Sequence, residues 1–458
     1  MQGIAANTLL RGLGALNGNP QITAVVTDSR AAASGSLFVC IAGERVDGHD
    51  FAEKAMAQGA EGILAQRAVA GVPAEKTVLV PDVLDAMITM GGNYRAAFSP
   101  TLVGVTGSVG KTTTKEFCYA VFSAFGKTLK TEGNQNNEIG MPNTLFRLEK
   151  ETQYAVIEMG MQGLGEIEKL TLAAKPCGAI ITCIGVSHLE QLGTRKNICR
   201  AKLEICDGMP QGAPLVLNGD DDLLPYATLR GDLKPVFFAI ENQAADVVAQ
   251  AIRCGAEGTH FVIIDRKYGE IPAYIPAMGN HNVMDALSAY ALATRLGLNP
   301  HRAAAALAEY RTTGHRQNLV RYKDVSVFED CYNASPDSMR AALSTLKNYA
   351  VEGRRIAVLG DMFELGTATE SAHTEIGDLC KQNNVDWLIT VGDAMQFAHV
   401  RAVALGLSAT HCKEKNEAIA LLRTQCAAGD AVLVKASHGM EFEKILAGFY
   451  ENAESERE

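Results

Sequence analysis

The stretch Thr106-Gly107-Ser108-Val109-Gly110-Lys111-Thr112-Thr113 decides how this chain is organised. The apolar run at 101–105 predicts a buried strand before it, and an apolar stripe over 114–125 predicts a helix after it. A glycine turn between a strand and a helix cradles phosphate, because glycines let backbone N–H groups approach oxygen closely and a helix N-terminus favours negative charge. Lys111 adds a point charge to this cradle, and Thr112 offers a hydroxyl to Mg²⁺.

One position departs from the longer form of this pattern. The form G-x-x-x-x-G-K-T requires glycine at position 105, where the chain has Val105, so only the compact T-G-x-x-G-K-T is present. A glycine turn next to a surface lysine is the alternative interpretation. The strand before the turn and the helix after it favour the phosphate cradle.

Composition limits the class of protein. At 458 residues the chain exceeds the size of one core, and its length indicates about two to four domains. The net charge of −10 argues against a nucleic-acid partner, because a phosphate backbone is bound by a basic surface. A local pocket for an anionic small molecule remains compatible with this charge.

The cysteines and the apolar runs indicate the compartment. The eleven cysteines include no C-x-x-C pair, which is typical of reduced thiols in protein cores. No apolar run approaches the ~20 residues that cross a bilayer, and the N-terminus lacks the basic and apolar blocks of a signal peptide. We therefore expect a cytoplasmic protein that does not insert into a membrane.

The order of predicted elements indicates an α/β protein of three domains. Residues 1–80 form a small N-terminal α/β domain, and residues 315–458 form a C-terminal doubly wound, Rossmann-like α/β domain. Residues 81–314 between them form a P-loop-type domain with a mostly parallel sheet and helices on both faces. Its parallel strands are expected at 101–105, 153–158, 178–184, 213–218 and 235–239, and antiparallel strands at its edge within 246–275.

Polar residues stand at the carboxyl ends of two of these strands, where ligands gather in an open parallel sheet. Glu158 ends the strand at 153–158, and His188 follows the strand at 178–184. Together with Thr112 they could bind Mg²⁺, although imidazole is a less usual ligand than oxygen. Taken alone, each is as consistent with a surface loop. Lys202, near Glu204 in a helical stretch, has the local pattern of a solvated helix face.

The chain resembles the Mur ligase family along essentially its whole length, and the matching segments occur in the same order as in that family. The matching segments are the ATP loop at 104–113, a substrate-facing loop at 132–140, magnesium-site segments at 157–160 and 188–190, Ala201-Lys202-Leu203-Glu204, Gly279-Asn280-His281-Asn282 and 330–338. Leu359-Gly360-Asp361-Met362-Phe363-Glu364-Leu365-Gly366 is characteristic of the branch that adds a dipeptide. The motif D-N-P-R, typical of branches that add a diamino acid, is absent from the sequence.

The resemblance implies roles for individual residues. Lys111, Lys202, His188 and Glu158 are implied to be catalytic, and Lys202 to carry a CO₂-derived carbamate. Two Mg²⁺ ions are implied at Thr112, Glu158, His188 and Lys202. The residues implied to bind ATP are Gly107, Ser108, Val109, Gly110, Lys111, Thr112, Thr113, Asn282, Arg316, Asp330 and Asn333. Those implied to bind the peptide substrate are Ser29, Arg30, Asp47, Asn136 and Asn137.

Three positions depart from the family pattern. Asp285 stands where relatives usually have a second asparagine near adenine, and Ser335 replaces the last asparagine of D-x-Y-N-A-N-P. After Lys435 the chain has Ala436-Ser437-His438, where the usual family pattern K-G-S-R has G-S-R. The contacts made at these three places are therefore open.

The resemblance also implies the reaction and the substrates. Residues 1–80 would bind the nucleotide of UDP-N-acetylmuramoyl-tripeptide, residues 81–314 ATP, and residues 315–458 would close over ATP and bind D-alanyl-D-alanine. ATP would phosphorylate the peptide carboxylate, and the dipeptide amine would attack the acyl phosphate. We expect a monomer.

Two alternatives remain. The first is a related ligase that acts on folate or another peptide, against which the opening domain with Ser29 and Arg30 argues. The second is a regulatory nucleotide-dependent ATPase, against which the set of Glu158, His188 and Lys202 argues.

Overall fold

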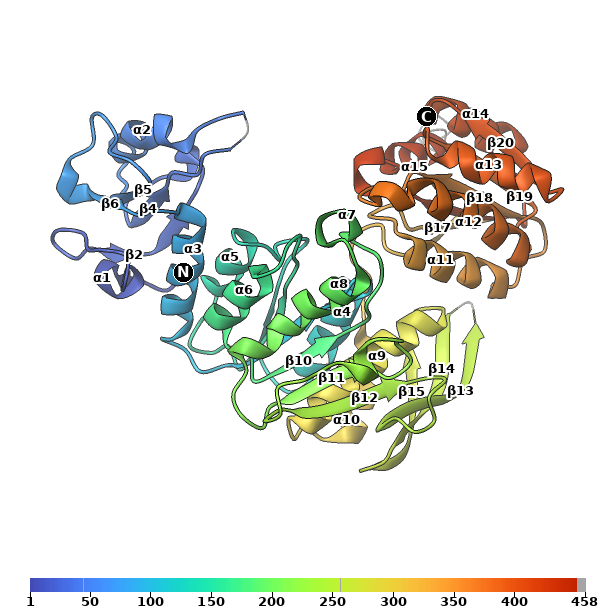
Figure 1. Ribbon diagram of the computed structural model, residues 1–458, viewed down its shortest axis with the longest axis horizontal. Coiled ribbons are helices and arrows are strands. Elements are labelled where there is room, and N and C mark those ends of the chain that lie inside the picture. Colours follow the sequence, from blue (N-terminus) through green and yellow to red (C-terminus); the bar gives the residue numbers. More distant parts are fainter. Residues whose placement is uncertain (44, 256, 451–458) are drawn as a thin grey trace.

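A computed structural model describes residues 1–43, 45–255 and 257–450. Three α/β units follow one another along the chain, each built on its own main sheet (Figure 1). The last eight residues of the third predicted domain lie outside the described residues. The α/β class is confirmed, whereas the division at residues 80 and 314 stays a prediction.

The first unit contains a two-stranded antiparallel sheet and a four-stranded parallel sheet of order β3-β4-β5-β6. Its strands are β1 Ile4–Ala5, β2 Gln21–Ile22, β3 Ala24–Val26, β4 Ser36–Val39, β5 Gly62–Ala65 and β6 Thr77–Leu79. Its helices are α1 Ala6–Leu9 and α2 Ala52–Ala57. β2 and β3 are consecutive along the chain but belong to different sheets.

The second unit is a nine-stranded sheet of order β15-β14-β13-β12-β11-β10-β7-β9-β8. Its strands are β7 Thr101–Thr106, β8 Thr128–Lys130, β9 Tyr154–Glu158, β10 Gly178–Ile181, β11 Pro214–Asn218, β12 Lys234–Ala239, β13 Val247–Gly255, β14 Gly258–Asp265 and β15 Gly269–Ile275. The seven neighbouring strands β13-β12-β11-β10-β7-β9-β8 pair in parallel. At the edge next to β13, β14 and β15 continue the sheet with antiparallel pairing, as predicted.

Helices cover both faces of this sheet (Figure 1). They are α3 Val83–Arg95, α4 Lys111–Ser123, α5 Gly140–Leu145, α6 Glu166–Ala174, α7 Leu189–Leu192, α8 Arg195–Leu203, α9 Asn280–Arg295 and α10 Pro300–Ala306. Alternate residues of β7 point to opposite faces: Leu102 joins the core with α3, α5 and α6, whereas Val103 and Val105 join the core with α4 and α9. Burial of β7 on both faces explains why its sequence is continuously apolar.

The third unit is a six-stranded sheet of order β16-β17-β21-β18-β19-β20, in which only β16 is antiparallel to its neighbour among the described strands. Its strands are β16 Asn318–Tyr322, β17 Val325–Glu329, β18 Arg355–Gly360, β19 Trp387–Val391, β20 Ser408–Cys412 and β21 Ala431–Lys435. Its helices are α11 Pro336–Asn348, α12 Thr369–Gln382, α13 Met395–Ala404, α14 Lys415–Gln425 and α15 Glu443–Tyr450. Trp387, the one tryptophan of the sequence, is buried at the start of β19, and its indole N–H donates to Thr410 Oγ1 at 3.1 Å.

Two further expectations can be compared with the structure. All eleven cysteines lie within the described residues and are unpaired, although Cys254 is exposed rather than in a core. Among the described helices, none combines the length and the apolar character that crossing a bilayer requires.

A buried ion pair joins the antiparallel edge of the central sheet to α9. Arg295 donates to both carboxylate oxygens of Asp265, at 2.8 and 3.0 Å, and the Asp265 side chain is fully buried. We expect Asp265→Ala to lower the free energy of unfolding by about 3 kcal/mol, because the guanidinium is left without its carboxylate. Calorimetry of the unfolding transition that includes the central sheet measures this loss. Arg266→Ala, at an exposed position of the next turn, is the matched control, and an equal loss in both variants would contradict the role of the pair.

Candidate active site

The turn after β7 has no room for side chains at its two key glycines. Gly107 has φ of 151°, and a Cβ there would lie 1.8 Å from Thr182 Oγ1. Gly110 has φ of 84°, and a Cβ there would lie 2.6 Å from Asp285 Oδ1. Both positions therefore require glycine, as a backbone that encloses phosphate does. The helix after the turn, α4, begins at Lys111, three residues earlier than predicted, so that Lys111 and Thr112 stand in its first turn.

Lys111 folds back over this turn. Its Nζ donates to the carbonyl oxygen of Gly107 at 2.9 Å and lies 3.5 Å from that of Ser108. Burial lowers the pKa of Lys111, while the nearby Glu158 partly opposes that shift. The buried Ser108 hydroxyl finds no hydrogen-bond partner among the described residues. A cation and an unsatisfied hydroxyl at a helix N-terminus fit the oxygens of a phosphate chain.

Glu158 lies at the end of β9 with almost no exposed surface. Its carboxylate accepts hydrogen bonds from Thr112 Oγ1 at 3.1 Å and from Asn136 Nδ2 at 2.8 Å. Lys115 Nζ, from the next turn of α4, lies 3.8 Å from the same carboxylate. The structure thus brings together Thr112 and Glu158, predicted for the metal site, and Asn136, predicted for the substrate site. Lys115 was missed by sequence reasoning, because nothing in the helical pattern distinguishes it from a surface lysine.

Lys202 is buried on α8, with 2% of its surface exposed. This position contradicts the solvated face that its local pattern indicates. Among the described residues, no group forms a hydrogen bond or ion pair with its Nζ. Burial holds the pKa of Lys202 well below its usual value, and the charge of Lys111 lowers it further. The result is a buried amine that favours its neutral form.

His188 lies in the loop between β10 and α7 and adopts a left-handed conformation, with φ of 62°. Burial lowers its pKa to about 4, and the charges of Lys111 and Lys202 add to the shift. The ring is therefore neutral at pH 7, which is the form that binds a metal ion. Its Nδ1 lies 3.0 Å from Glu364 Oε2 of the third unit.

A cavity of about 410 Å³ opens between the second and third units beside these residues. Its walls come from the turn at 108–113, from Asn136 and Glu158, from the start of α9, and from the third unit. The predicted residues that line it are Ser108, Val109, Gly110, Lys111, Thr112, Thr113, Asn136, Glu158, Asn282, Arg316, Asp330 and Asn333. Lys202 and His188 are not among its lining residues.

The third unit contributes a set of linked polar groups to the cavity. Lys435 Nζ pairs with the carboxylate of Asp330 at 2.8 Å and donates to the carbonyl oxygen of Asn333 at 2.9 Å. The guanidinium of Arg316 lies over the ring of Tyr332, 3.7 Å from its centroid. Sequence reasoning missed the roles of Lys435 and Tyr332, which become visible only when β17 and β21 pair side by side.

The start of helix α9 also lines the cavity, directly beside the phosphate-binding turn. Asn282 Nδ2 donates to the Met278 carbonyl at 2.7 Å and to Gln317 Oε1 at 3.1 Å. Asp285, which replaces the usual asparagine, is buried and accepts a hydrogen bond from Thr114 Oγ1 at 2.9 Å. Burial raises the pKa of Asp285 well above its usual value. The carboxyl oxygen accepts the Thr114 hydrogen bond as the oxygen of an asparagine amide would.

The other two departures have structural roles. Ser335 caps α11, since its hydroxyl accepts a hydrogen bond from the Ser338 amide at 3.4 Å. Ser437 Oγ accepts a hydrogen bond from the Phe363 amide at 3.0 Å. Both serines therefore stabilise loops of the third unit that border or support the cavity.

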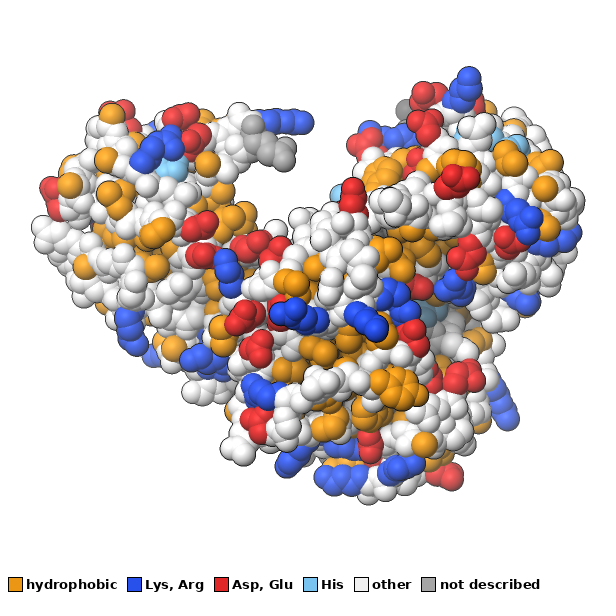
Figure 2. All heavy atoms as spheres, in the orientation of Figure 1, with side chains coloured by type: hydrophobic (Ala, Val, Ile, Leu, Met, Phe, Trp, Pro, Cys, Tyr) orange, Lys and Arg blue, Asp and Glu red, His pale blue; other side chains and the backbone are white. Residues whose placement is uncertain are grey.

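The remaining substrate candidates are divided between two places. Asn137 Oδ1 accepts a hydrogen bond from the Gly140 amide at 2.9 Å, at the start of α5. Ser29, Arg30 and Asp47 lie in the first unit and do not line the cavity. Figure 2 shows a broad open hollow between the first and third units, with the central unit as its floor. A long substrate would have to extend along this hollow to contact both the candidates of the first unit and those of the central unit.

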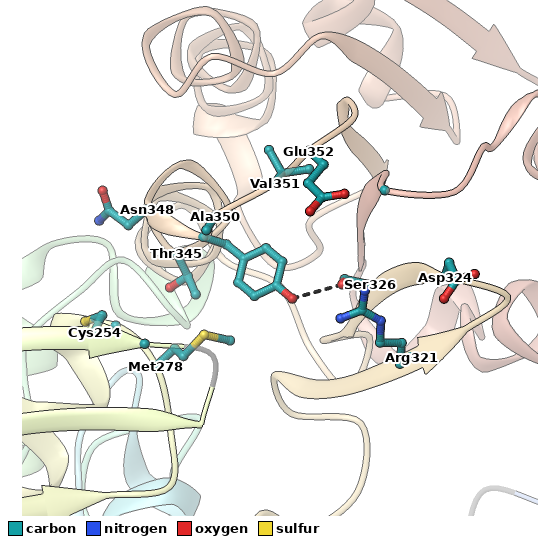
Figure 3. Close-up of a pocket in the computed structure, with 14 residues that line it drawn as sticks. Cys254, Met278, Arg321, Asp324, Ser326, Thr345, Asn348, Ala350, Val351 and Glu352 are labelled. Carbon is teal, nitrogen blue, oxygen red and sulfur yellow. Dashed lines mark hydrogen bonds between the residues drawn. The ribbon is translucent and has the colours of Figure 1, made fainter.

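A second cavity, of about 270 Å³, also lies between the second and third units. Cys254 and Met278 form one wall, and Arg321, Ser326 and Tyr349 form the other (Figure 3). The Tyr349 hydroxyl and Ser326 Oγ lie 2.9 Å apart in its wall. None of the predicted site residues lines this cavity, so it is separate from the candidate active site.

The donor set at the first cavity fits magnesium better than a transition metal. Across the described part of the chain, no three His, Cys, Asp or Glu side chains gather as a preformed metal cluster. Glu158 and the Thr112 hydroxyl instead offer two oxygen atoms next to a phosphate-binding turn. Mg²⁺ keeps several waters and takes further ligands from substrate phosphates, so a sparse set of protein oxygens is what it requires.

Comparison with known proteins matches three family models to the chain. They are the Mur ligase family catalytic domain at 21–89, the Mur ligase middle domain at 105–293 and the Mur ligase glutamate ligase domain at 315–438. The chain belongs to the Mur ligase family. The matched segments fall in the three units in the same order.

Two bacterial relatives that match this chain over nearly its whole length carry the same name. The UDP-N-acetylmuramoyl-tripeptide–D-alanyl-D-alanine ligase of Bacillus subtilis is 37% identical, with 95% of each chain covered. The protein of the same name from Escherichia coli is 33% identical, with 95% of this chain and 97% of the relative covered.

Solved structures of family members have the same fold. MurF from Acinetobacter baumannii has a TM-score of 0.89 at 29% identity, and the coverage is 98% of this chain and 99% of that one. MurF from Thermotoga maritima in complex with ADP has a TM-score of 0.84 at 28% identity, with 94% and 98% covered.

The burial of His188 predicts its titration in the protein without nucleotide. We expect the imidazole to titrate near pH 4, because burial disfavours the charged ring and Lys111 and Lys202 add to that cost. In the unfolded chain the ring gains its proton below about pH 6.5, so this group lowers folding stability as the pH falls from 6.5 towards 4.

Nuclear magnetic resonance of ¹⁵N-labelled histidine measures this pKa, with His188→Gln to assign the resonance. In Lys111→Met the pKa of His188 should rise, because the neighbouring charge that lowers it most is removed, yet stay below 6.5 because the ring remains partly buried. A wild-type titration at 6.5 would contradict the buried, neutral ring.

Proposed function

We propose that this chain is an ATP-dependent ligase that joins D-alanyl-D-alanine to UDP-N-acetylmuramoyl-tripeptide, in the synthesis of peptidoglycan precursors. The observation that carries this proposal is the match over nearly the whole length to relatives of that name. The phosphate-binding turn, which opens on a cavity between two units, gives the proposal its chemistry.

The reaction has two steps. A carboxylate oxygen of the peptide bonds to the γ-phosphorus of ATP, the bond from that phosphorus to the bridging oxygen of ADP breaks, and ADP leaves behind an acyl phosphate. The amine of the dipeptide then attacks the acyl carbon, the C–O bond to phosphate breaks, and the amine loses a proton as the amide forms. The work of the protein is positioning and charge neutralisation, which dominate phosphoryl transfer.

Residues around the turn hold the nucleotide in this proposal. Backbone amides at 107–113 enclose the phosphates, and Lys111 exchanges its contacts with two loop carbonyls for phosphate oxygens. Asn282 on α9 and Arg316 of the third unit also line the cavity and contact the rest of ATP. Asp330 and Asn333, linked through Lys435, fix the third unit where it covers the nucleotide and excludes water from the acyl phosphate.

In this proposal two Mg²⁺ ions would be held by Thr112, Glu158, His188 and a modified Lys202. When bound, the metal supplies neutralisation of the charge that develops on the transferring phosphoryl group. Asn136 fixes one oxygen of Glu158 through its hydrogen bond and leaves the carboxylate oriented towards Thr112.

The environment of Lys202 supports a carbamate at its Nζ. A carbamate forms when the neutral amine bonds to the carbon of CO₂ and releases a proton. A buried lysine with a depressed pKa, and without an ion pair among the described groups around it, is predisposed to that reaction. The carbamate replaces a cation, which would repel a metal ion, with an anion that can bind one.

The first unit binds the nucleotide end of the peptide substrate through Ser29, Arg30 and Asp47, and Asn137 lies near its peptide end. We further propose that residues 1–80, 81–314 and 315–458 act as three domains, and that the protein is a cytoplasmic monomer that binds no nucleic acid. A folate-directed ligase is a weaker candidate, because folylpolyglutamate synthase of Mycobacterium tuberculosis is similar in fold alone, at 15% identity. A regulatory ATPase that forms no covalent product is weaker still, because it needs no buried lysine.

Phosphate release with pairs of substrates tests the function. We expect release from ATP and Mg²⁺ only when UDP-N-acetylmuramoyl-tripeptide and D-alanyl-D-alanine are both present, with one amide formed per phosphate. Mass spectrometry of the product identifies the bond. Equal release without the dipeptide, or release with folate and glutamate instead, would contradict the proposal.

Lys202 provides a test of the carbamate. We expect Lys202→Ala to lose on the order of 10²–10³-fold in turnover while still binding ATP, because an anion at the metal site is removed. A small carboxylic acid added to this variant should restore part of the activity by entering the vacated space. Lys196→Ala, at an exposed position of the same helix α8, is the matched control. Full activity of Lys202→Ala, or no effect of CO₂ removal on the wild type, would exclude a carbamate.

A further inference from the structure

The loop at 183–190 lies between the phosphate-binding turn and the third unit. On one side, the Ser108 amide donates to the Cys183 carbonyl at 3.0 Å. On the other, a Cβ at Gly185 would lie 2.3 Å from Asp337 Oδ2, and Val186 packs against the core of the third unit. This loop is therefore a direct connection between the phosphate site and the unit that covers it.

His188 and Glu364 meet where this loop contacts the third unit. His188 Nδ1 lies 3.0 Å from Glu364 Oε2, although the two are not aligned as a hydrogen bond. Both residues have a left-handed backbone, with φ of 62° and 63°, which side-chain-bearing residues rarely adopt. Such conformations persist where the surroundings enforce them, and they concentrate at functional sites.

The loop that carries Glu364 is fixed by the third unit. The Met362 amide donates to His373 Nε2 at 3.0 Å, and the Phe363 amide donates to Ser437 Oγ at 3.0 Å. Asp361 Oδ1 accepts a hydrogen bond from the Met395 amide at 2.8 Å. Next to Glu364, the Gly366 position abuts Glu190, where an added Cβ would lie 3.4 Å from the Glu190 Cβ. Rigid elements of the third unit thus present the Glu364 carboxylate to the loop at 183–190.

A carboxylate at one ring nitrogen determines what the other nitrogen can do. When Nδ1–H donates to a carboxylate, the tautomer is fixed and Nε2 is free to bind a cation. The charges of Lys111 and Lys202 also act on this ring, while Glu364 of the third unit lies against its Nδ1.

We propose that Glu364 is a positioning residue of the metal site, which fixes the tautomer and the orientation of His188 from the third unit. This inference rests on the proposed function, since it concerns the metal ligand His188. Because Glu364 belongs to the third unit, the metal site is complete only while that unit is docked on the central sheet. Docking of the third unit and metal binding are then coupled through one side chain.

Metal affinity tests this role without any peptide substrate. Mn²⁺ is titrated into the full-length protein with a non-hydrolysable ATP analogue, and bound Mn²⁺ is followed by electron paramagnetic resonance. We expect Glu364→Ala to weaken Mn²⁺ binding by about 10- to 100-fold, as loss of a residue that orients a metal ligand does. Glu364→Gln should lose less, because its amide oxygen remains an acceptor beside Nδ1. Glu370→Ala, at an exposed position at the start of α12, is the matched control and should bind as the wild type does.

A double-mutant cycle separates this role from a general structural one. In a His188→Ala background, Glu364→Ala should cause no further loss of Mn²⁺ affinity, because its effect passes through the ring. A full additional loss in that background, or unchanged affinity in Glu364→Ala, would overturn the proposal. A wild type without a nucleotide-dependent Mn²⁺ site would overturn it as well. If the peptide substrates fail to release phosphate while this cycle behaves as expected, the function is wrong and the positioning role stands.

Discussion

The site depends on how buried positive charge is balanced. Lys111, Lys202 and His188 lie close enough for their charges to act on one another, and burial disfavours the charged form of all three. The buried carboxylate of Glu158 is the opposing group on their side of the cavity, and its own hydrogen bonds go to Thr112 and Asn136. Such a surplus of basic groups in a low-dielectric site is costly unless an anion enters or the amines lose their protons. Phosphate binding and lysine modification are two ways to remove the same cost.

The sheet explains why these groups converge. β7, β9 and β10 are adjacent and parallel, so their carboxyl ends place the phosphate turn, Glu158 and the loop of His188 at one edge. The third unit adds a second set of charges whose internal pairing, Lys435 with Asp330, is complete before any ligand binds. The second unit thus contributes basic groups whose charge is not balanced, whereas the buried Lys435 of the third unit is paired with Asp330.

Periodicity and turn chemistry predicted much of the fold. The strands that contain β7, β9 and β11 were found because both of their faces are buried and their sequences are continuously apolar. No strand was predicted at β16 or β20, since these edge strands are partly exposed and their sequences are half-polar. Glu158 and His188 could be placed from their positions after strands. Lys202 could not, because burial of a helical lysine depends on the elements packed around it, and only the family resemblance pointed to it. Lys115, Lys435 and Glu364 depend on contacts between distant segments, which no local pattern encodes.

The position of Trp387 has a practical consequence for anyone who studies this protein by optical spectroscopy. Its indole is enclosed at the start of β19, inside the third unit and away from both cavities. Intrinsic tryptophan emission therefore reports the integrity of one unit of the three and is blind to events in the other two. A denaturation curve recorded by fluorescence alone would describe the covering unit, while circular dichroism would average over the whole chain, so a difference between the two curves would reveal whether the units unfold together.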